Sequence, residues 1–365
     1  MATDTHVVAD AGVHTPDLVD SQATRETVAL FENLQRLAGN RMLFGHQHAT
    51  EYGHGWGGDN DRSDVKSVCG SHPAVVGLEL NGLSGRSREQ IERSKAGLRT
   101  QIVDTYNRGG VATLCWHFNN PVTGSGFRSQ PGASSVVASL LPGASHHDQY
   151  REVLADIADL ANSVIGAHGT LAPLIFRPFH EFDGDWFWWG KPFCSREDFV
   201  TLWRFTVTYL RDELAVRNFL YAFSPDCLFQ TEQAFLERYP GDDWVDLVGM
   251  DDYADFGRDG KYDLDAGIAK LQIISDYAIR HGKLAAFTET GLESIADANW
   301  WTESLLPAIT AAGLRLCYVL VWRNDIHSDT HYFAPFPGHP SVPDFLKFAD
   351  DPRIVLERDI PQLYA

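Results

Sequence analysis

From Arg25 onward the sequence alternates short apolar runs with longer amphipathic segments, and this alternation most constrains the fold. Eight of the apolar runs are expected to be strands: Met42–His46, Ala74–Leu80, Val111–His117, Leu174–His180, Phe219–Ser224, Asp246–Asp251, Leu284–Thr288 and Leu316–Trp322. A strand that is followed by a helix can pair in parallel with its successor. The pattern therefore predicts one α/β domain over residues 25–365, a single (β/α)8 TIM barrel with its active site at the C-terminal ends of the strands.

The segments between these strands carry helical periodicity and helix-ending signals. The expected helices are Arg88–Asn107, His147–Ile165, Arg196–Glu213, Thr231–Arg238, Leu264–Arg280, Trp300–Ala312 and Pro343–Phe348. A doubly wound open sheet is the alternative fold, but it usually carries a glycine-rich phosphate turn after its first strand. This chain has G-H-Q-H there, which favours the barrel.

Residues 1–24 are polar and lack periodicity, so we expect a tail on the surface and no second domain. The N-terminus has no basic segment followed by an apolar one, as a signal peptide would have. No apolar run reaches about 18 residues, so no membrane span is expected. The sequence alone leaves open a cytoplasmic protein or a secreted or periplasmic one whose signal peptide is missing from this chain.

The charge and the aromatic content limit the class of partner. The formal net charge of −19 disfavours nucleic acids and anionic membranes. Ten tryptophans among 12% aromatic residues suit a neutral carbohydrate, although a tryptophan-rich core is the other interpretation. The five cysteines form no C-x-x-C pair; Cys115 and Cys317 are expected to be buried, and a disulfide among the other three is unsupported.

One stretch, Leu174–Gly190, combines the features of a sugar-cleaving site. It reads L-I-F-R-P-F-H-E-F-D-G-D-W-F-W-W-G, a strand-like run followed by a carboxylate and three indoles. A carboxyl group can protonate a glycosidic oxygen, and indole faces stack on sugar rings. We expect Trp186, Trp188 and Trp189 to face the site, since a turn of Asp and Gly is a poor place to bury them.

Polar residues also gather at the other expected strand ends, which indicates a polar cavity at one end of the barrel. They include His46, Gln47, His48, Glu79, Asn81, His117, Asn119, Asn120, Arg177, His180, Ser224, Asp226, Asp251, Asp252, Tyr253, Trp322, Arg323, Asn324 and Asp325.

Glu181 and Glu289 are the candidate catalytic pair, because their strands lie three apart and their ends face each other across the barrel. Two such carboxylates perform retaining glycoside hydrolysis when they are about 5–5.5 Å apart, and inverting hydrolysis when the gap is wider. Either one can instead form a structural ion pair, for example with Arg177 or Arg323. Glu181 lies beside indoles and is expected to be the acid/base. Glu289 is expected to be the nucleophile, oriented by Tyr253 on the neighbouring strand.

Other chemistries find less support. His46 and His48 share one face of a strand, but two ligands without a third are weak support for a metal site, and His146-His147 begins a helix. The chain has no G-x-S-x-G elbow and no phosphate-binding loop. No metal and no cofactor are expected.

The motif R-P-F-H-E-F-D-G-D-W-F-W-W-G closely resembles the acid/base motif of glycoside hydrolase family 26, whose main activity is β-mannanase. The resemblance extends over most of the chain, through L-F-G-H-Q-H, T-L-C-W-H-F-N-N-P, L-L-P-G-A-S-H-H-D-Q-Y, V-G-M-D-D-Y, F-T-E-T-G and V-L-V-W-R-N-D. It implies a (β/α)8 barrel and a retaining mechanism, with Glu181 as the acid/base on strand four and Glu289 as the nucleophile on strand seven.

The resemblance also implies roles for other residues. His180 matches the histidine before the acid, and Tyr253 matches the tyrosine that binds the nucleophile. Trp322 resembles the floor of the −1 subsite, and His117 a −1 histidine. Arg323 and Asp251 resemble −2 subsite residues, and Trp186 an aromatic residue on the leaving-group side.

The chain departs from the family where D-G-D follows the acid, since Asp185 adds a carboxylate near the +1 side or faces solvent. The loops 119–145 and 254–263 are expected to rim the site and to decide whether the cleft is open at both ends. The leading hypothesis is a monomeric, retaining endo-β-1,4-mannanase acting on mannan, galactomannan or glucomannan. The alternatives are an exo-acting, mannobiose-releasing mannanase, a family 26 β-1,3-xylanase or β-glucanase, and a non-enzymatic carbohydrate-binding barrel.

Overall fold

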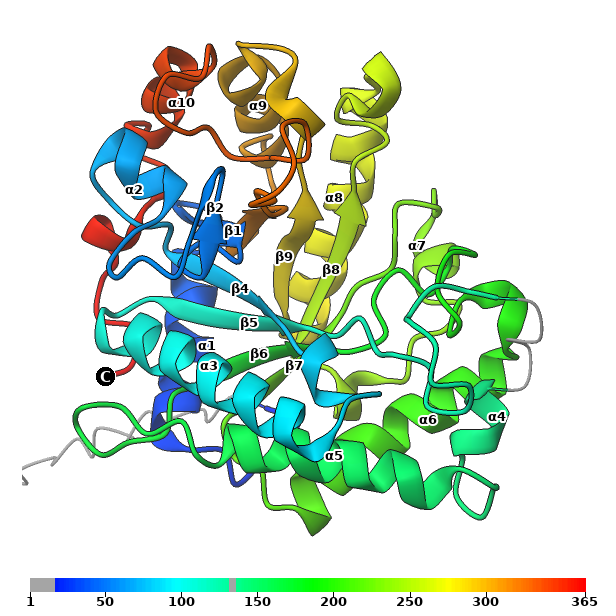
Figure 1. The fold of residues 1–365 in the computed structure, drawn as a ribbon. Coiled ribbons are helices and arrows are strands. Elements are labelled where there is room, and N and C mark those ends of the chain that lie inside the picture. Colours follow the sequence, from blue (N-terminus) through cyan, green and yellow to red (C-terminus); the bar gives the residue numbers. More distant parts are fainter. Residues whose placement is uncertain (1–16, 131–135) are drawn as a thin grey trace, which may run out of the picture.

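A computed structural model describes residues 17–130 and 136–365 as a closed parallel barrel surrounded by helices (Figure 1). The eight strands pair in the order β10-β9-β8-β7-β6-β5-β4-β1, and β10 pairs with β1 to close the ring. They are β1 (Met42–Gln47), β4 (Val75–Glu79), β5 (Val111–Cys115), β6 (Leu174–Arg177), β7 (Phe219–Phe223), β8 (Leu247–Asp252), β9 (Leu284–Thr290) and β10 (Tyr318–Val321). The predicted (β/α)8 barrel and its eight strands are thus confirmed.

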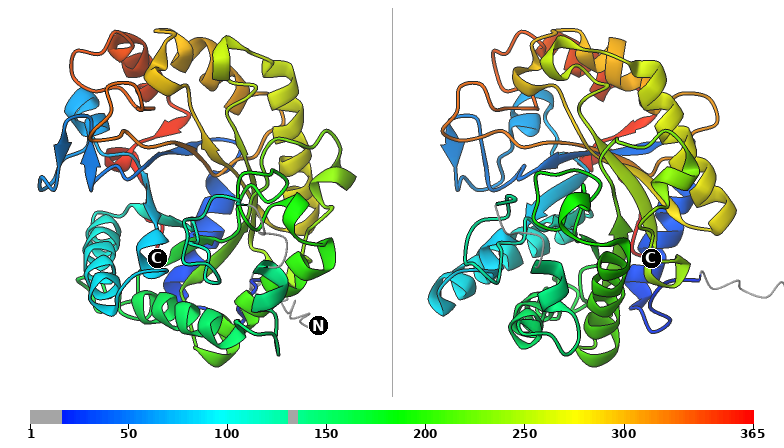
Figure 2. Two further views of the ribbon diagram at one scale, coloured as in Figure 1. Left: turned by 45° about the vertical axis from the view of Figure 1, so that its right-hand side comes forward. Right: turned by 90° about the vertical axis from the view of Figure 1, so that its right-hand side faces the viewer.

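Helices follow the strands and pack on the outside of the ring, as both views of Figure 2 show. Those in the described part of the chain are α1 (Arg25–Leu37), α2 (Asp64–Cys69), α3 (Arg88–Asn107), α4 (Val136–Leu140), α5 (His147–Ala161), α6 (Arg196–Thr208), α7 (Glu232–Phe235), α8 (Leu264–His281), α9 (Leu306–Ile309) and α10 (Val342–Ala349). Ser195 caps α6, since its hydroxyl accepts a hydrogen bond from the backbone N–H of Asp198 at 3.0 Å. The expected helices at 196–213 and 300–312 are each part α-helix and part π-helix.

Alternation along the strands divides the core into two layers. Leu43, Val75 and Val111 point into the barrel together with one face of α1, whereas Phe44, Val76 and Leu114 pack against the surrounding helices. Because α1 covers the N-terminal end of the barrel, the opposite end is the one left for a site.

Part of the predicted surface tail, residues 18–20, is anchored to the barrel. Leu18, Val19 and Asp20 are at most 9% exposed. The backbone N–H of Val19 donates to the Asp246 carboxylate at 2.8 Å, just before β8. The anchoring could not be predicted from the polar composition of this segment, since only two apolar side chains make the contact. The remainder of the predicted tail, 1–16, lies outside the described residues.

The last residues of the chain are attached to the same end of the barrel. Strand β11 (Ile354–Val355) pairs in parallel with β1, outside the ring. The Tyr364 hydroxyl donates to the Gly110 carbonyl at 2.6 Å, at the start of β5. Neither β11 nor the hairpin of β2 (Tyr52–Gly53) and β3 (Trp56–Gly57) was expected, because two-residue strands leave no periodic pattern.

Two further expectations concern cysteines and membranes. All five cysteines are free, and Cys115 and Cys317 are buried as expected. No helix in residues 17–130 and 136–365 is long and apolar enough to cross a membrane.

Candidate active site

A cleft of about 1010 Å³ opens at the C-terminal ends of the strands. Its size is at the upper end of the range for ligand pockets, so it has room for more than one sugar ring. The predicted site residues that line it are Glu181, Glu289, His117, Trp186, Tyr253, Trp322 and Arg323. The two predicted rim loops also line it, through Phe127 and Arg128 in one and Gly257–Gly260 and Tyr262 in the other.

Glu289, near the end of β9, is held by two donors. The Arg177 guanidinium contacts its Oε2 at 2.6 Å, and the Tyr253 hydroxyl donates to its Oε1 at 2.8 Å. The residue is 4% exposed. Burial and the negative charge of Glu289 raise the pKa of Tyr253 well above its usual value, so the hydroxyl keeps its proton and remains a donor. The orientation of Glu289 by Tyr253, predicted from the strand order, is present.

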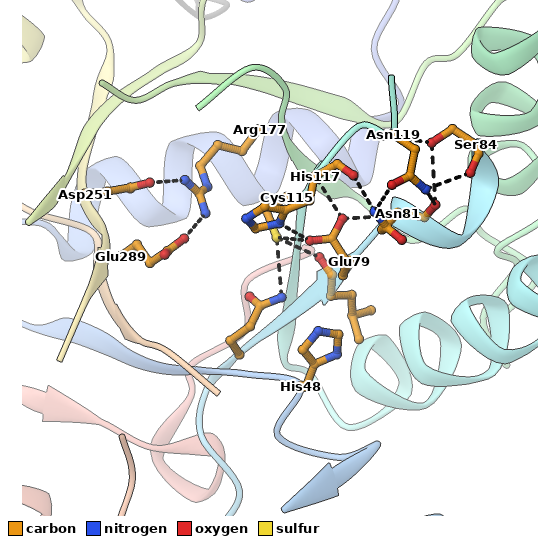
Figure 3. A network of polar contacts seen from close by, with 12 residues as sticks. His48, Glu79, Asn81, Ser84, Cys115, His117, Asn119, Arg177, Asp251 and Glu289 are labelled. Carbon is orange, nitrogen blue, oxygen red and sulfur yellow. Dashed lines mark hydrogen bonds and ion pairs between the residues drawn. The ribbon is translucent and has the colours of Figure 1, made fainter. Parts of the chain in front are cut away.

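Asp251 lies beneath the cleft and is not among the residues that line it. Its carboxylate is fully buried and binds Arg177 and the Thr288 hydroxyl. Burial lowers the pKa of Arg177, but the charges of Asp251 and Glu289 outweigh this and hold the pKa well above its usual value. The expectation that Asp251 contacts substrate is therefore corrected: Asp251 holds the arginine that holds Glu289 (Figure 3).

Glu181 follows β6 in a strained turn. Both Phe179 and Glu181 have positive φ, 49° and 53°, which is costly for residues with a β-carbon. Two hydrogen bonds hold the turn: the Glu181 N–H donates to the Ser224 carbonyl at 2.9 Å, and the Trp189 indole donates to the His180 carbonyl at 2.8 Å. The turn aims the carboxyl group into the cleft.

The surroundings of Glu181 favour its protonated form. Burial raises the pKa of its carboxyl well above the usual value, and the charges of Glu289 and Asp226 raise it further. The Trp186 indole N–H donates to its Oε2, which opposes the shift. A carboxyl group that retains its proton near neutral pH can act as a general acid.

Only one of the three expected cleft tryptophans is in the cleft. Trp186 lines it, whereas Trp188 and Trp189 are fully buried in the core. The Trp188 indole donates to the Phe118 carbonyl at 2.7 Å, which satisfies its polar atom inside the protein. The expectation for Trp188 and Trp189 was wrong, because these rings turn inward, Trp188 against Phe118 and Trp189 against Phe179.

His117 and Glu79 form a second pair on the cleft wall (Figure 3). The His117 Nδ1 contacts Glu79 Oε2, and the backbone N–H of His117 donates to Oε1 at 2.9 Å. Asn81 donates its side-chain amide to the His117 carbonyl at 2.7 Å. Burial raises the pKa of Glu79, but the His117 ring and the hydrogen bonds from His117 outweigh it, and the net shift is downward. Glu79 thus fixes the ring of a residue predicted to bind substrate.

His180 is 1% exposed and lies behind His117, with 4.6 Å between ring centres. Burial and the positive charge of Arg177 lower its pKa well below the usual value, so its ring is neutral. Neither ring nitrogen has a hydrogen-bond partner in the described part of the chain. The structure therefore places His180 under the cleft wall and not on its surface.

On the side of β10, Trp322 and Arg323 line the cleft as expected. Arg323 pairs with Asp325 at 2.9 Å, which fixes its guanidinium at the rim. Asp185, the unusual acid after Glu181, is exposed and is not among the residues that line the cleft.

Two of the histidines weighed as metal ligands bind other groups: His48 pairs with Glu51, and the ring of His147 bonds the Leu140 carbonyl. His46 is fully buried, and neither of its ring nitrogens has a hydrogen-bond partner among the described residues. Two other groups have donor atoms within 4.8 Å of one another: His180 with Asp251 and Glu289, and Glu79 with Cys115 and His117. The first group already holds Arg177 between its carboxylates, and a cation there would have to displace it.

Several cleft residues were missed because they lie in loops well beyond the strand ends. They include Phe187, Leu292, Glu293, Ser294, Thr330, His331 and Phe333. The aromatic residues in this set are a weak signal that the sequence contains, since loops seldom carry aromatic rings without a function.

Comparison with known proteins identifies the family. The model of glycosyl hydrolase family 26 matches residues 19–286. A mannan endo-1,4-β-mannosidase of Bifidobacterium adolescentis is 33% identical over 355 residues, which is 92% of this chain and 35% of that protein, so the chain spans about a third of that relative's length. A solved GH26 β-mannanase from Bacteroides ovatus is 42% identical with a TM-score of 0.87, covering 94% of this chain and 98% of that one. The structure of GH26C from a Muricauda species is 38% identical with a TM-score of 0.89, covering 95% and 96%. This chain belongs to glycosyl hydrolase family 26.

Proposed function

We propose that the protein is a retaining endo-β-1,4-mannanase that hydrolyses mannan, galactomannan or glucomannan. The observation that carries the proposal is that Glu181 and Glu289 line one cleft in opposite electrostatic surroundings. Arg177 and Tyr253 donate to Glu289, whereas burial and neighbouring carboxylates favour the protonated form of Glu181. The named activities of the B. adolescentis and B. ovatus relatives support mannan as the substrate.

In the first step Glu289 attacks the anomeric carbon of the −1 sugar, and a covalent glycosyl-enzyme forms. The bond to the leaving oxygen breaks as Glu181 transfers its proton to that oxygen. In the second step Glu181, now ionised, takes a proton from water, and the water oxygen displaces Glu289. Arg177 and Tyr253 hold Glu289 in place throughout, which leaves its carboxylate few other orientations.

The remaining cleft residues are assigned to sugar binding. Trp322 forms the floor beneath the reacting sugar, His117 reaches the same ring, and Arg323 binds on the glycone side. Trp186 binds on the leaving-group side while it donates to Glu181. His180 acts by packing behind His117 and not by touching sugar. We also propose a monomer, and a polymeric substrate favours a secreted or periplasmic protein over a cytoplasmic one.

A product time course on mannohexaose and galactomannan, with barley β-glucan as a control, tests the proposal. A spread of mannose oligomers together with an early fall in galactomannan viscosity is the expected result. Mannobiose alone from the start would show exo action by the same two glutamates. Activity on β-glucan and none on either mannan would refute the substrate.

A further inference from the structure

Cys115 has no part in the proposed reaction, yet its thiol lies directly beneath the cleft wall (Figure 3). The register of β4 and β5 places Glu79 opposite Cys115, and His117 follows two residues later on the same face. The Cys115 Sγ is 3.2 Å from Glu79 Oε2, and His117 Nδ1 contacts that same oxygen. Three donor atoms of different chemistry therefore lie within 4.8 Å of one another.

A thiolate, an imidazole nitrogen and a carboxylate oxygen are ligands that Zn²⁺ and Cd²⁺ accept, and Zn²⁺ sites with three protein ligands leave a fourth position open. Glu79 and His117 line the cleft, so a cation can enter from there and keep water as its fourth ligand. Neighbouring groups also fix the orientation of these ligands. Glu79 Oε1 accepts the backbone N–H groups of Asn81 and His117 at 2.8 and 2.9 Å, and the Gln47 amide lies 3.5 Å from Sγ.

Hydrogen bonds among the three side chains now occupy the space that a cation would take. The Cys115 thiol hydrogen-bonds to Glu79, and His117 shares a second hydrogen bond with it. Binding of M²⁺ forms S–M, N–M and O–M bonds and breaks the S–H bond. The thiol proton leaves to solvent, and the hydrogen between His117 Nδ1 and Glu79 moves through solvent to Nε2 of the same ring.

We infer that Glu79, Cys115 and His117 form a binding site for a thiophilic divalent cation, Zn²⁺ or Cd²⁺, and that occupation of this site inhibits the enzyme. A bound cation takes the place of the contact between His117 Nδ1 and Glu79 Oε2, so it shifts the ring of a residue that is proposed to bind sugar. The inhibition rests on the proposed function, whereas the binding does not. Substrate and cation should compete, because His117 serves both.

Cadmium titration of the whole protein tests the binding, with the ultraviolet thiolate-to-cadmium charge-transfer absorption as the readout. The wild type should develop this band at about one equivalent, with release of a proton. Cys115→Ser should lose the band and require roughly 10–100-fold more Cd²⁺ for half-inhibition of mannan hydrolysis. Cys69→Ser is the matched control, since Cys69 is half-buried and its thiol donates to the Ser71 carbonyl, away from the cleft; it should behave as the wild type.

A second variant guards against a folding defect in Cys115→Ser. His117→Gln keeps the thiol, and it should weaken the band by a similar factor while melting cooperatively. Equal bands in the wild type and Cys115→Ser, or loss of the band in Cys69→Ser, would overturn the inference. A protein that hydrolyses mannan and ignores Cd²⁺ refutes this inference alone, whereas one that gives the band without hydrolysing any mannan refutes the proposed function alone.

Discussion

Glu289 and Glu181 face the same cleft from strands three apart, but different groups are packed around them. Glu289 receives hydrogen bonds from Arg177 and Tyr253, and these stabilise a carboxylate. Glu181 has one indole donor, and burial and nearby negative charges act against its ionisation. The difference teaches that identical side chains acquire separate roles from what is packed around them.

The largest expected effect comes from Glu289→Ala, because no covalent intermediate can form without the nucleophile. We expect kcat on mannan to fall by about 10⁴–10⁶-fold. Steady-state hydrolysis of mannohexaose checks this. Added azide should restore turnover by direct displacement and give the inverted α-mannosyl azide; a β-azide would mean that the two roles are exchanged.

Glu181→Ala should cost about 10²–10⁴-fold in kcat/KM on mannan, since the leaving oxygen must depart without a proton. An aryl mannobioside whose leaving group needs no proton is the matched substrate. Its first step should be nearly unaffected, and a burst of released phenol should precede slow turnover. An equal loss on both substrates would remove Glu181 from the acid role.

Two substitutions sharpen the comparison by removing the donors one at a time. Tyr253→Phe removes the hydroxyl that donates to Glu289, a hydrogen bond to a charged group worth about 1.5–3 kcal/mol. Because this contact is needed in the reacting geometry, kcat should fall by about 10- to 100-fold with little change in KM. Unchanged kcat would show that Arg177 alone suffices to hold Glu289.

Trp186→Phe removes the donor to Glu181 and should have the smallest effect on rate at the optimum. The indole N–H lowers the pKa of Glu181, so its loss should move the basic limb of the kcat/KM profile to higher pH. The measurement is a pH–rate profile of both proteins; a shift to lower pH would contradict the assignment of that limb to Glu181.

The raised pKa of Glu181 also has a consequence for stability. Because the folded state holds this proton more tightly than the unfolded state, the stabilisation is fully present below the ordinary carboxyl pKa and is lost as pH rises through the raised pKa. In Glu181→Gln the side chain cannot ionise, so this loss of stability with rising pH is absent. Its melting temperature relative to the wild type should therefore be higher at neutral pH than at pH 4, as calorimetry at both pH values would show.

The barrel and its catalytic pair were predictable because both depend on local patterns. Alternating strands and helices leave strong periodicity, and the strand order then brings Glu181, Glu289 and Tyr253 together without any knowledge of the loops. Asp251 was misassigned for a different reason. The sequence around a carboxylate at a strand end does not show whether its side chain faces the cleft or, as in Asp251, a buried arginine.

For the aromatic residues too, the sequence did not show which side chains face the cleft. Trp186 and Trp188 are two positions apart in one loop, but one lines the cleft and the other is fully buried. The direction of each ring is set by tertiary contacts: Trp186 donates to the Glu181 carboxylate, and Trp188 packs on Phe118. Phe333 and His331 were missed because a long loop returns them to the cleft from beyond β10.

Both described ends of the chain are attached to the barrel base, opposite the cleft, through Val19 beside β8 and Tyr364 beside β5. Because both ends lie opposite the cleft, the protein can be attached to a surface in one defined orientation. Protein tethered to a bead, or fused to a second module, through either end will present its cleft outward, toward a polymer too large to diffuse beneath it. Chemical coupling through surface lysines gives no such orientation, so end-tethered protein should digest insoluble mannan faster than protein coupled at random.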